Sequence, residues 1–148
     1  MILNKQKKVR LATRPLREFL RETQRELNIA RSEITVALVS DAEIARWNEA
    51  YRNKKGPTDV LSFPAVSGAS HKSTARASGA NSGEILGDIA IAPETAKRYA
   101  KKNGRSLAAE IRVLMLHGVL HLMGYDHESD RGQMNRIEQK LRRKLGIA

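Results

Sequence analysis

The hydrophobic and polar positions of this chain alternate with helical spacing in some segments and strand spacing in others. Residues Pro15–Leu27 repeat apolar side chains at helical intervals with charged residues between them, which predicts an amphipathic helix. Residues Ile34–Val39 form an apolar run rich in β-branched side chains, which predicts a strand. Shorter runs of the same kind predict strands at Val60–Phe63 and Ile85–Ile91.

Start and stop signals predict the remaining helices. Ser40, followed three residues later by Glu43, forms a capping box ahead of a helix over residues 41–51. Later signals of the same kind are Pro93 and Gly104 for one helix, Ser106 for the next, and Asp130 and Gly146 for the last.

This order of elements predicts an α+β fold. We expect a single domain over residues 1–148, with a small mixed sheet of about four strands packed with helices. Residues 66–83, between the second and third predicted strands, are rich in Ser, Gly and Ala and contain no acidic residue. We expect this segment to be a mobile polar loop, and its histidine, His71, is a weak candidate for a metal ligand.

Composition narrows the functional classes. The 148 residues carry a net charge of +11, which favours a polyanionic partner, nucleic acid before an anionic membrane. Aromatic residues make up only 4%, so we expect contacts to phosphates rather than a stacking platform. There is no apolar run of eighteen residues, no secretory signal and no cysteine, so we expect a cytoplasmic protein without membrane association.

The most informative segment is HGVLHLMGYDH, from His117 to His127, which holds three of the four histidines. His117 and His121 are four residues apart, so a helix places both imidazoles on one face. Gly124 can end that helix and turn the chain so that His127 reaches the same point. Three neutral imidazoles leave a fourth tetrahedral position open, which is typical of a catalytic zinc site.

The spacing also matches the HExxHxxGxxH motif of metzincin proteases, with one difference. Gly118 occupies the position of the glutamate that acts as general base in those enzymes. This argues against peptide hydrolysis by the usual route. Zinc held by three neutral imidazoles can activate water near neutral pH without a strong base. Attack by a ribose 2′-hydroxyl on a phosphate polarised by the metal is an equally open alternative.

Three separated motifs resemble the YbeY family of bacterial rRNA endonucleases and maturation factors. The first is NEAYR, residues 48–52, followed by PTDVLSFP, residues 57–64. The second is LGDIAI, residues 86–91. The third is HGVLHLMGYDH itself, followed by Met134 and Glu138.

The resemblance implies a zinc-dependent, single-strand-preferring endoribonuclease with one zinc ion per chain. Its ligands fall on His117, His121 and His127, and the functional arginine of the family falls on Arg52. It implies 3′-end maturation of 16S rRNA in the small ribosomal subunit, and ribosome quality control. The expected partners are rRNA and, with it, ribosomal proteins or an assembly GTPase. The length and composition of the 66–83 segment are a departure from the family pattern.

Other charged residues have candidate roles that the sequence leaves open. Lys54 and Lys55 are candidates for contacts to the RNA backbone. Asp126 is a candidate for orienting a ligand ring, with turn formation as the alternative. Asp59 and Asp88 are candidates for a base or for supporting a ligand, and Asp59 has local backbone bonding as its alternative. Arg52 has helix-end bonding to carbonyls as its alternative.

Two other functions remain open at this point. One is a ribosome-assembly or RNA-binding factor without catalytic activity, whose zinc is structural. The other is a metalloprotease-like hydrolase, which Gly118 disfavours.

Overall fold

The computed structural model describes residues 1–65, 84–126 and 130–147 and shows four strands and five helices among them. The predicted α+β fold with a four-stranded mixed sheet is confirmed. No described helix combines the length and the apolar character needed to cross a bilayer. The elements are β1 (Ile2–Asn4), α1 (Thr13–Glu26), β2 (Glu33–Leu38), α2 (Asp41–Arg52), β3 (Val60–Pro64), β4 (Ile85–Ile91), α4 (Pro93–Asn103), α5 (Leu107–Leu122) and α6 (Gln133–Lys144).

The sheet has the strand order β1-β2-β4-β3. β1 and β4 both run parallel to β2, and β3 closes the other edge antiparallel to β4. β1 was not among the strands predicted individually. It has only three residues, of which Ile2 alone is buried, so the sequence shows no alternation long enough to detect.

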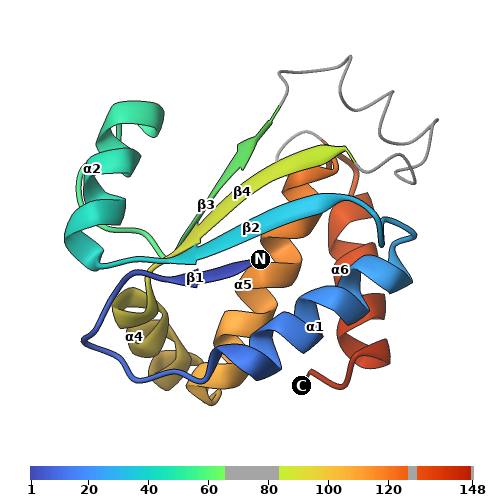
Figure 1. The fold of residues 1–148 in the computed structure, drawn as a ribbon, viewed down its shortest axis with the longest axis horizontal. Helices are drawn as coiled ribbons and strands as arrows, with labels where there is room; N and C mark the ends of the chain where they lie inside the picture. Colours follow the sequence, from blue (N-terminus) through green and yellow to red (C-terminus); the bar gives the residue numbers. More distant parts are fainter. Residues whose placement is uncertain (66–83, 127–129, 148) are drawn as a thin grey trace.

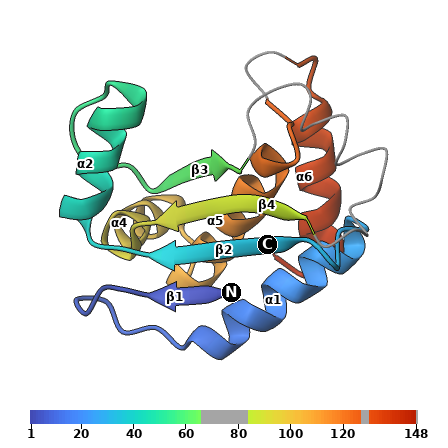
Figure 2. The same cartoon turned by 45° about the horizontal axis from the view of Figure 1, so that its top comes forward.

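The helices cover the two faces of the sheet unequally. Figures 1 and 2 show α1, α5 and α6 together on one face, with α2 standing at the other side near the carboxyl ends of β2 and β4. The main core lies under the helical face, where Ile111, Met115 and Val119 of α5 pack against Ile89 and Ile91 of β4. On the other face Ile44 and Trp47 of α2 pack against Leu61, Phe63 and Ala90 of the sheet.

The predicted helix signals act as expected. The Ser40 hydroxyl accepts a hydrogen bond from the Glu43 N–H at 3.2 Å, and the Ser106 hydroxyl accepts one from the Ala109 N–H at 3.1 Å. Gly104 ends α4 in the left-handed region, with a φ of 70°. These local contacts fix where α2, α4 and α5 begin or end, and therefore which residues of α5 face the sheet.

Candidate metal centre

His117 and His121 form a close pair on one face of α5. Their Nε2 atoms are 3.0 Å apart, and their rings meet edge to face with centroids separated by 4.6 Å. Two imidazole nitrogens bound to a tetrahedral zinc ion at ~2.0–2.1 Å would lie about 3.3 Å apart. The pair therefore fits a shared zinc ion with only a small adjustment of the two side chains.

Glu138 of α6 supports the pair from behind. Its Oε1 lies 3.0 Å from Nδ1 of His117, and its Oε2 lies 4.0 Å from a guanidinium nitrogen of Arg142. With Nδ1 protonated, His117 donates to the carboxylate and keeps the lone pair of Nε2 for a metal. In protein zinc sites, a ligand histidine commonly donates its other ring N–H to a carboxylate, which fixes the orientation of the ring.

The packing of α6 on α5 places Glu138 beside His117. Met134 and Leu141 are buried against Leu116 and Leu120 of α5. Met134 is therefore a core residue, as helical packing predicts. Gly132, not Asp130, is the N-cap residue of α6. The Asp130 carboxylate, two residues earlier, still accepts hydrogen bonds from the N–H groups of Gly132 and Met134, both at 2.8 Å.

The chain leaves α5 through the predicted glycine turn. Gly124 has a φ of 100°, and its N–H donates to the His121 carbonyl while the Tyr125 N–H donates to the Leu120 carbonyl. His127 and His71 lie outside the described residues. Within the described part of the chain, no group of three His, Asp or Glu side chains is placed to hold a metal. The ligand role of His127 thus stays a prediction.

Gly118 faces the sheet rather than the histidine pair. A Cβ at this position would lie 2.8–3.0 Å from three side-chain carbons of Ile89. The helix therefore approaches β4 too closely for a larger residue without a shift of Ile89. The protease glutamate could not occupy this position without displacing the core. Close packing against Ile89 therefore explains why a glycine is present here.

Asp59 lies toward the other end of α5. Burial raises the pKa of its carboxyl, and the Glu110 carboxylate adds to that rise. Hydrogen bonds from the backbone N–H groups of Asp59 and Val60 and from the Thr58 hydroxyl lower the pKa and offset part of the rise. Glu110 itself is buried and paired with Arg105 at 2.9 Å. Because Glu110 precedes His117 by two helical turns, roughly 10 Å along the axis, this carboxylate pair is separate from the histidine pair.

Asp88 and Asp126 take different positions around the centre. Ile89 contacts α5, so its neighbour Asp88 points to the opposite face of the sheet, where it is exposed and pairs in register with Phe63. Asp126 is exposed in the turn after α5, and its carbonyl accepts a hydrogen bond from the Asp130 N–H at 3.1 Å. Asp126 is thus near the histidine helix, and Asp88 is across the sheet from it.

Arg52, Lys54 and Lys55 are exposed at the end of α2 and in the turn that follows. Asn48 holds this turn, because its side-chain amide donates to the Gly56 carbonyl at 3.0 Å and its own carbonyl accepts from the Lys54 N–H at 3.2 Å. Among the described residues, no hydrogen bond or ion pair joins Arg52 to the histidines. The three cations belong to the α2 side of the sheet.

Comparison with known proteins decides the family. The family model described as Endoribonuclease YbeY matches residues 1–146. The chain belongs to the YbeY endoribonuclease family. It is similar to the Endoribonuclease YbeY of Koribacter versatilis, with 39% identity over 99% of this chain and 86% of the relative. The corresponding protein of Heliobacterium modesticaldum is 42% identical over 78% of this chain and 71% of the relative.

A solved structure has a similar fold. The solution structure of a Thermotoga maritima protein matches 98% of this chain and 89% of its own length, with a TM-score of 0.65 and 27% identity. The family model and the relatives confirm the family resemblance predicted from three motifs, and the match to the YbeY model includes both α2 with its cations and the α5–α6 pair.

Glu138 is the supporting residue to which sequence reasoning gave no role. It appears among the residues that follow the histidine motif in the YbeY resemblance, four positions after Met134 on a predicted amphipathic helix. That spacing puts it on the buried side of α6 and could have marked it. Its contact with His117 depends on how α6 packs on α5, which local spacing cannot determine.

Proposed function

We propose that this protein is a zinc-dependent endoribonuclease that cleaves single-stranded RNA. The observation that carries the proposal is the convergence of the His117 and His121 Nε2 atoms, with Glu138 holding the far nitrogen of His117. The relatives are named as endoribonucleases, which supports RNA as the substrate. We further propose that the biological reaction is 3′-end maturation of 16S rRNA, with a part in ribosome quality control.

The donor set suits one zinc ion per chain. His117 and His121 would hold it, with His127 as the third ligand. A zinc ion bound there would act as a Lewis acid toward the phosphodiester and would activate water near neutral pH. Glu138 fixes the tautomer and orientation of His117, and Arg142, beside its second oxygen, helps to balance its charge in a partly buried position.

The remaining requirement is stabilisation of the charge that grows on the phosphate group. Arg52 is our candidate, because a guanidinium binds phosphate oxygens in pairs and stays charged. Lys54 and Lys55 lie within three residues of it and supply point charges for neighbouring phosphates. Arg52 lies on α2, so this role requires its guanidinium to approach the phosphate held at the histidine centre when RNA is bound.

The expected partners follow from this reaction. We propose rRNA of the small subunit as substrate and the cytoplasm as the location, with ribosomal proteins or an assembly GTPase as helper proteins. The charge of +11 supports an RNA partner. A metalloprotease is disfavoured, because the position of its base is occupied by a glycine packed against Ile89.

A paired measurement of metal content and RNA cleavage tests the proposal. Wild-type protein loaded with zinc should cleave an unstructured RNA, and removal of zinc by a chelator should stop cleavage reversibly. The variant His117→Ala with His121→Ala should lose both zinc and activity while keeping its helical circular dichroism. Equal cleavage by this variant would identify a contaminating nuclease and refute the proposal. A strong loss of Tm on zinc removal, with no turnover by the loaded protein, would instead indicate an assembly factor with structural zinc.

A further inference from the structure

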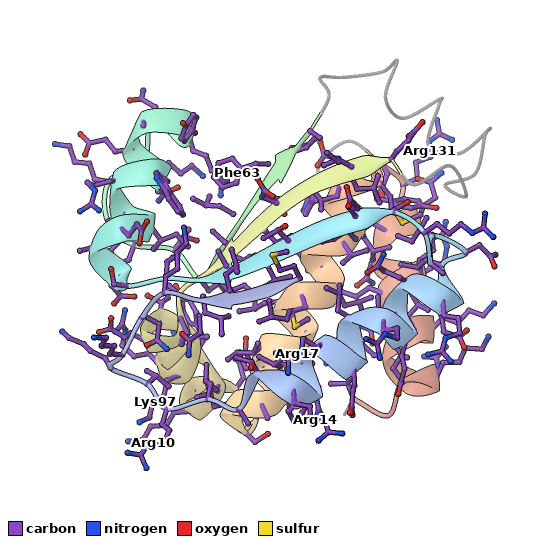
Figure 3. All side chains as sticks on the ribbon, in the orientation of Figure 1. Arg10, Arg14, Arg17, Phe63, Lys97 and Arg131 are labelled. Atoms are coloured by element: carbon purple, nitrogen blue, oxygen red, sulfur yellow. The ribbon has the colours of Figure 1, made fainter. Side chains whose placement is uncertain are left out.

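Three aromatic residues meet on the face of the sheet that carries α2. The chain has only one Trp, three Tyr and two Phe, and Trp47, Tyr51 and Phe63 lie together. The Phe63 ring contacts Trp47 edge to face at 6.1 Å and Tyr51 at 5.4 Å between centroids. Figure 3 shows Phe63 on the side of the sheet toward α2. A low aromatic content therefore still yields one local cluster.

The three rings differ in their exposure. Trp47 and Phe63 are half-buried, whereas Tyr51 is 70% exposed. The edge-to-face contact with Phe63 orients the Tyr51 ring and leaves much of its apolar surface in contact with water. An aromatic ring held in this way loses little conformational entropy when a flat partner stacks on it.

Positive charge surrounds this ring. Arg52 follows Tyr51 directly, and Lys54 and Lys55 lie in the turn that Asn48 holds. None of these three cations forms an ion pair within the described part of the chain. A π-face beside unpaired cations matches the two contacts made by unpaired nucleotides, which are base stacking and phosphate binding. Apolar protein partners would not require the cations, and paired bases would not offer their faces.

The position of β3 links this surface to the histidine side. β3 is an edge strand, and Phe63 points toward α2. Its neighbour Ser62 pairs in register with Ile89, which packs against Gly118 of α5, so Ser62 points to the histidine side. A strand of RNA that passed around this edge would contact both faces. We propose that Tyr51, supported by Phe63, is a stacking platform for an unpaired RNA base, with Lys54 and Lys55 binding adjacent phosphates.

This proposal rests on the proposed function for its ligand, RNA, but its test does not depend on cleavage. Trp47 is the only tryptophan and lies in the cluster, so its fluorescence reports on stacking at Tyr51 and Phe63. Binding of a short unstructured oligoribonucleotide should change this fluorescence. The measurement is made with the wild-type chain, and the RNA is checked afterwards to confirm that it is intact. It is repeated with the variant His117→Ala with His121→Ala, in which we expect no cleavage.

Four variants, one of them a control, separate the contributions. Tyr51→Ala should weaken binding about tenfold with its Tm unchanged, and Tyr51→Phe should bind like wild type. Tyr99→Ala is the matched control, because Tyr99 is 42% exposed on α4 and outside the cluster. Lys54→Ala with Lys55→Ala should reduce the slope of log affinity against log salt by about 1.4, whereas Tyr51→Ala should leave that slope unchanged.

The outcomes are distinct from those of the cleavage assay. Wild-type affinity in a folded Tyr51→Ala variant would overturn the platform, even if the protein cleaves RNA, and would indicate a surface for a protein partner. Weakened binding in Tyr51→Ala but not in Tyr99→Ala would support the platform, even if zinc-loaded protein cleaves nothing.

Discussion

The two faces of the sheet place their functional side chains in opposite ways. On the α5–α6 face, His117 is held by His121 on one side and by Glu138 on the other, and Glu138 is only 13% exposed. On the α2 face, Tyr51, Arg52, Lys54 and Lys55 are exposed. A centre for chemistry needs a fixed geometry, whereas a surface for a flexible strand needs reach and charge. The contrast thus separates a fixed pair of candidate metal ligands from an exposed cationic surface, and Arg52 belongs to that surface.

The largest effect should come from placing the protease base in the histidine helix. Gly118→Glu would force a side chain against Ile89 and bury its charge, so we expect a loss of more than about 4 kcal/mol in unfolding free energy. Denaturant unfolding measures it, and no peptidase activity should appear. Ala108→Glu, exposed on the first turn of the same helix, is the control and should be neutral. A stable Gly118→Glu protein would disprove the close packing of α5 on β4.

The next largest effect concerns Arg52, on the opposite face. Arg52→Ala should lower kcat by about 10²-fold with zinc content unchanged, because a guanidinium that stabilises developing phosphate charge acts in the transition state. Single-turnover cleavage and metal analysis together measure this, and Arg52→Lys should recover only part of the rate. A rise in KM with unchanged kcat would instead make Arg52 a binding residue and sharpen the division between the two faces.

A third prediction concerns the contact between Glu138 and His117. Glu138→Gln removes the charged acceptor of the His117 ring and should raise the zinc Kd by about 10–100-fold, measured by competition with a chelating dye. Gln139→Ala, a change at the exposed next position of α6, is the matched control. An unchanged zinc Kd in Glu138→Gln would show that the carboxylate does not tune the metal ligand.

Local signals explain which features the sequence could predict. Ser40, Ser106 and Asp130 act through neighbouring backbone groups, so their helices were predicted near their true starts. The four-residue spacing likewise placed His117 and His121 together. β1 was missed because a three-residue strand with one buried side chain depends on its partner strand for recognition.

Tertiary placement explains what the sequence left out. Glu138 meets His117 across 21 positions of sequence through the packing of α6. Asp59 and Asp88 could be named as candidates from the sequence. The strand register and the contact of Ile89 with α5 place Asp88 on the opposite face of the sheet, and the proximity of Glu110 places Asp59 toward the other end of α5. Composition also suggested too few aromatic residues for a platform. Trp47 and Tyr51 share one face of a helix, yet Phe63 joins them only after β3 folds under α2.

The smallest effect concerns Asp59, which belongs to neither functional face. Burial raises the folded-state pKa of this carboxyl above its ordinary value, with Glu110 adding to the rise. Between the unfolded and folded pKa values the native state binds more protons, so stability falls as pH rises through that window, and the cost persists at higher pH. Asp59→Asn keeps an oxygen that can accept the backbone N–H bonds and removes the charge.

We therefore expect Asp59→Asn to raise Tm slightly at pH 7 and to lose that advantage below the unfolded pKa. Thermal unfolding in the presence of a chelator measures the difference, since loss of zinc on acidification would otherwise contribute. Glu49→Gln, at an exposed position of α2, should show no such pH-dependent gain. An advantage that grows on acidification would have the opposite sign to desolvation and would mean that Asp59 is stabilised as an anion. In that case Asp59 would have to be reconsidered as a base available to the RNA.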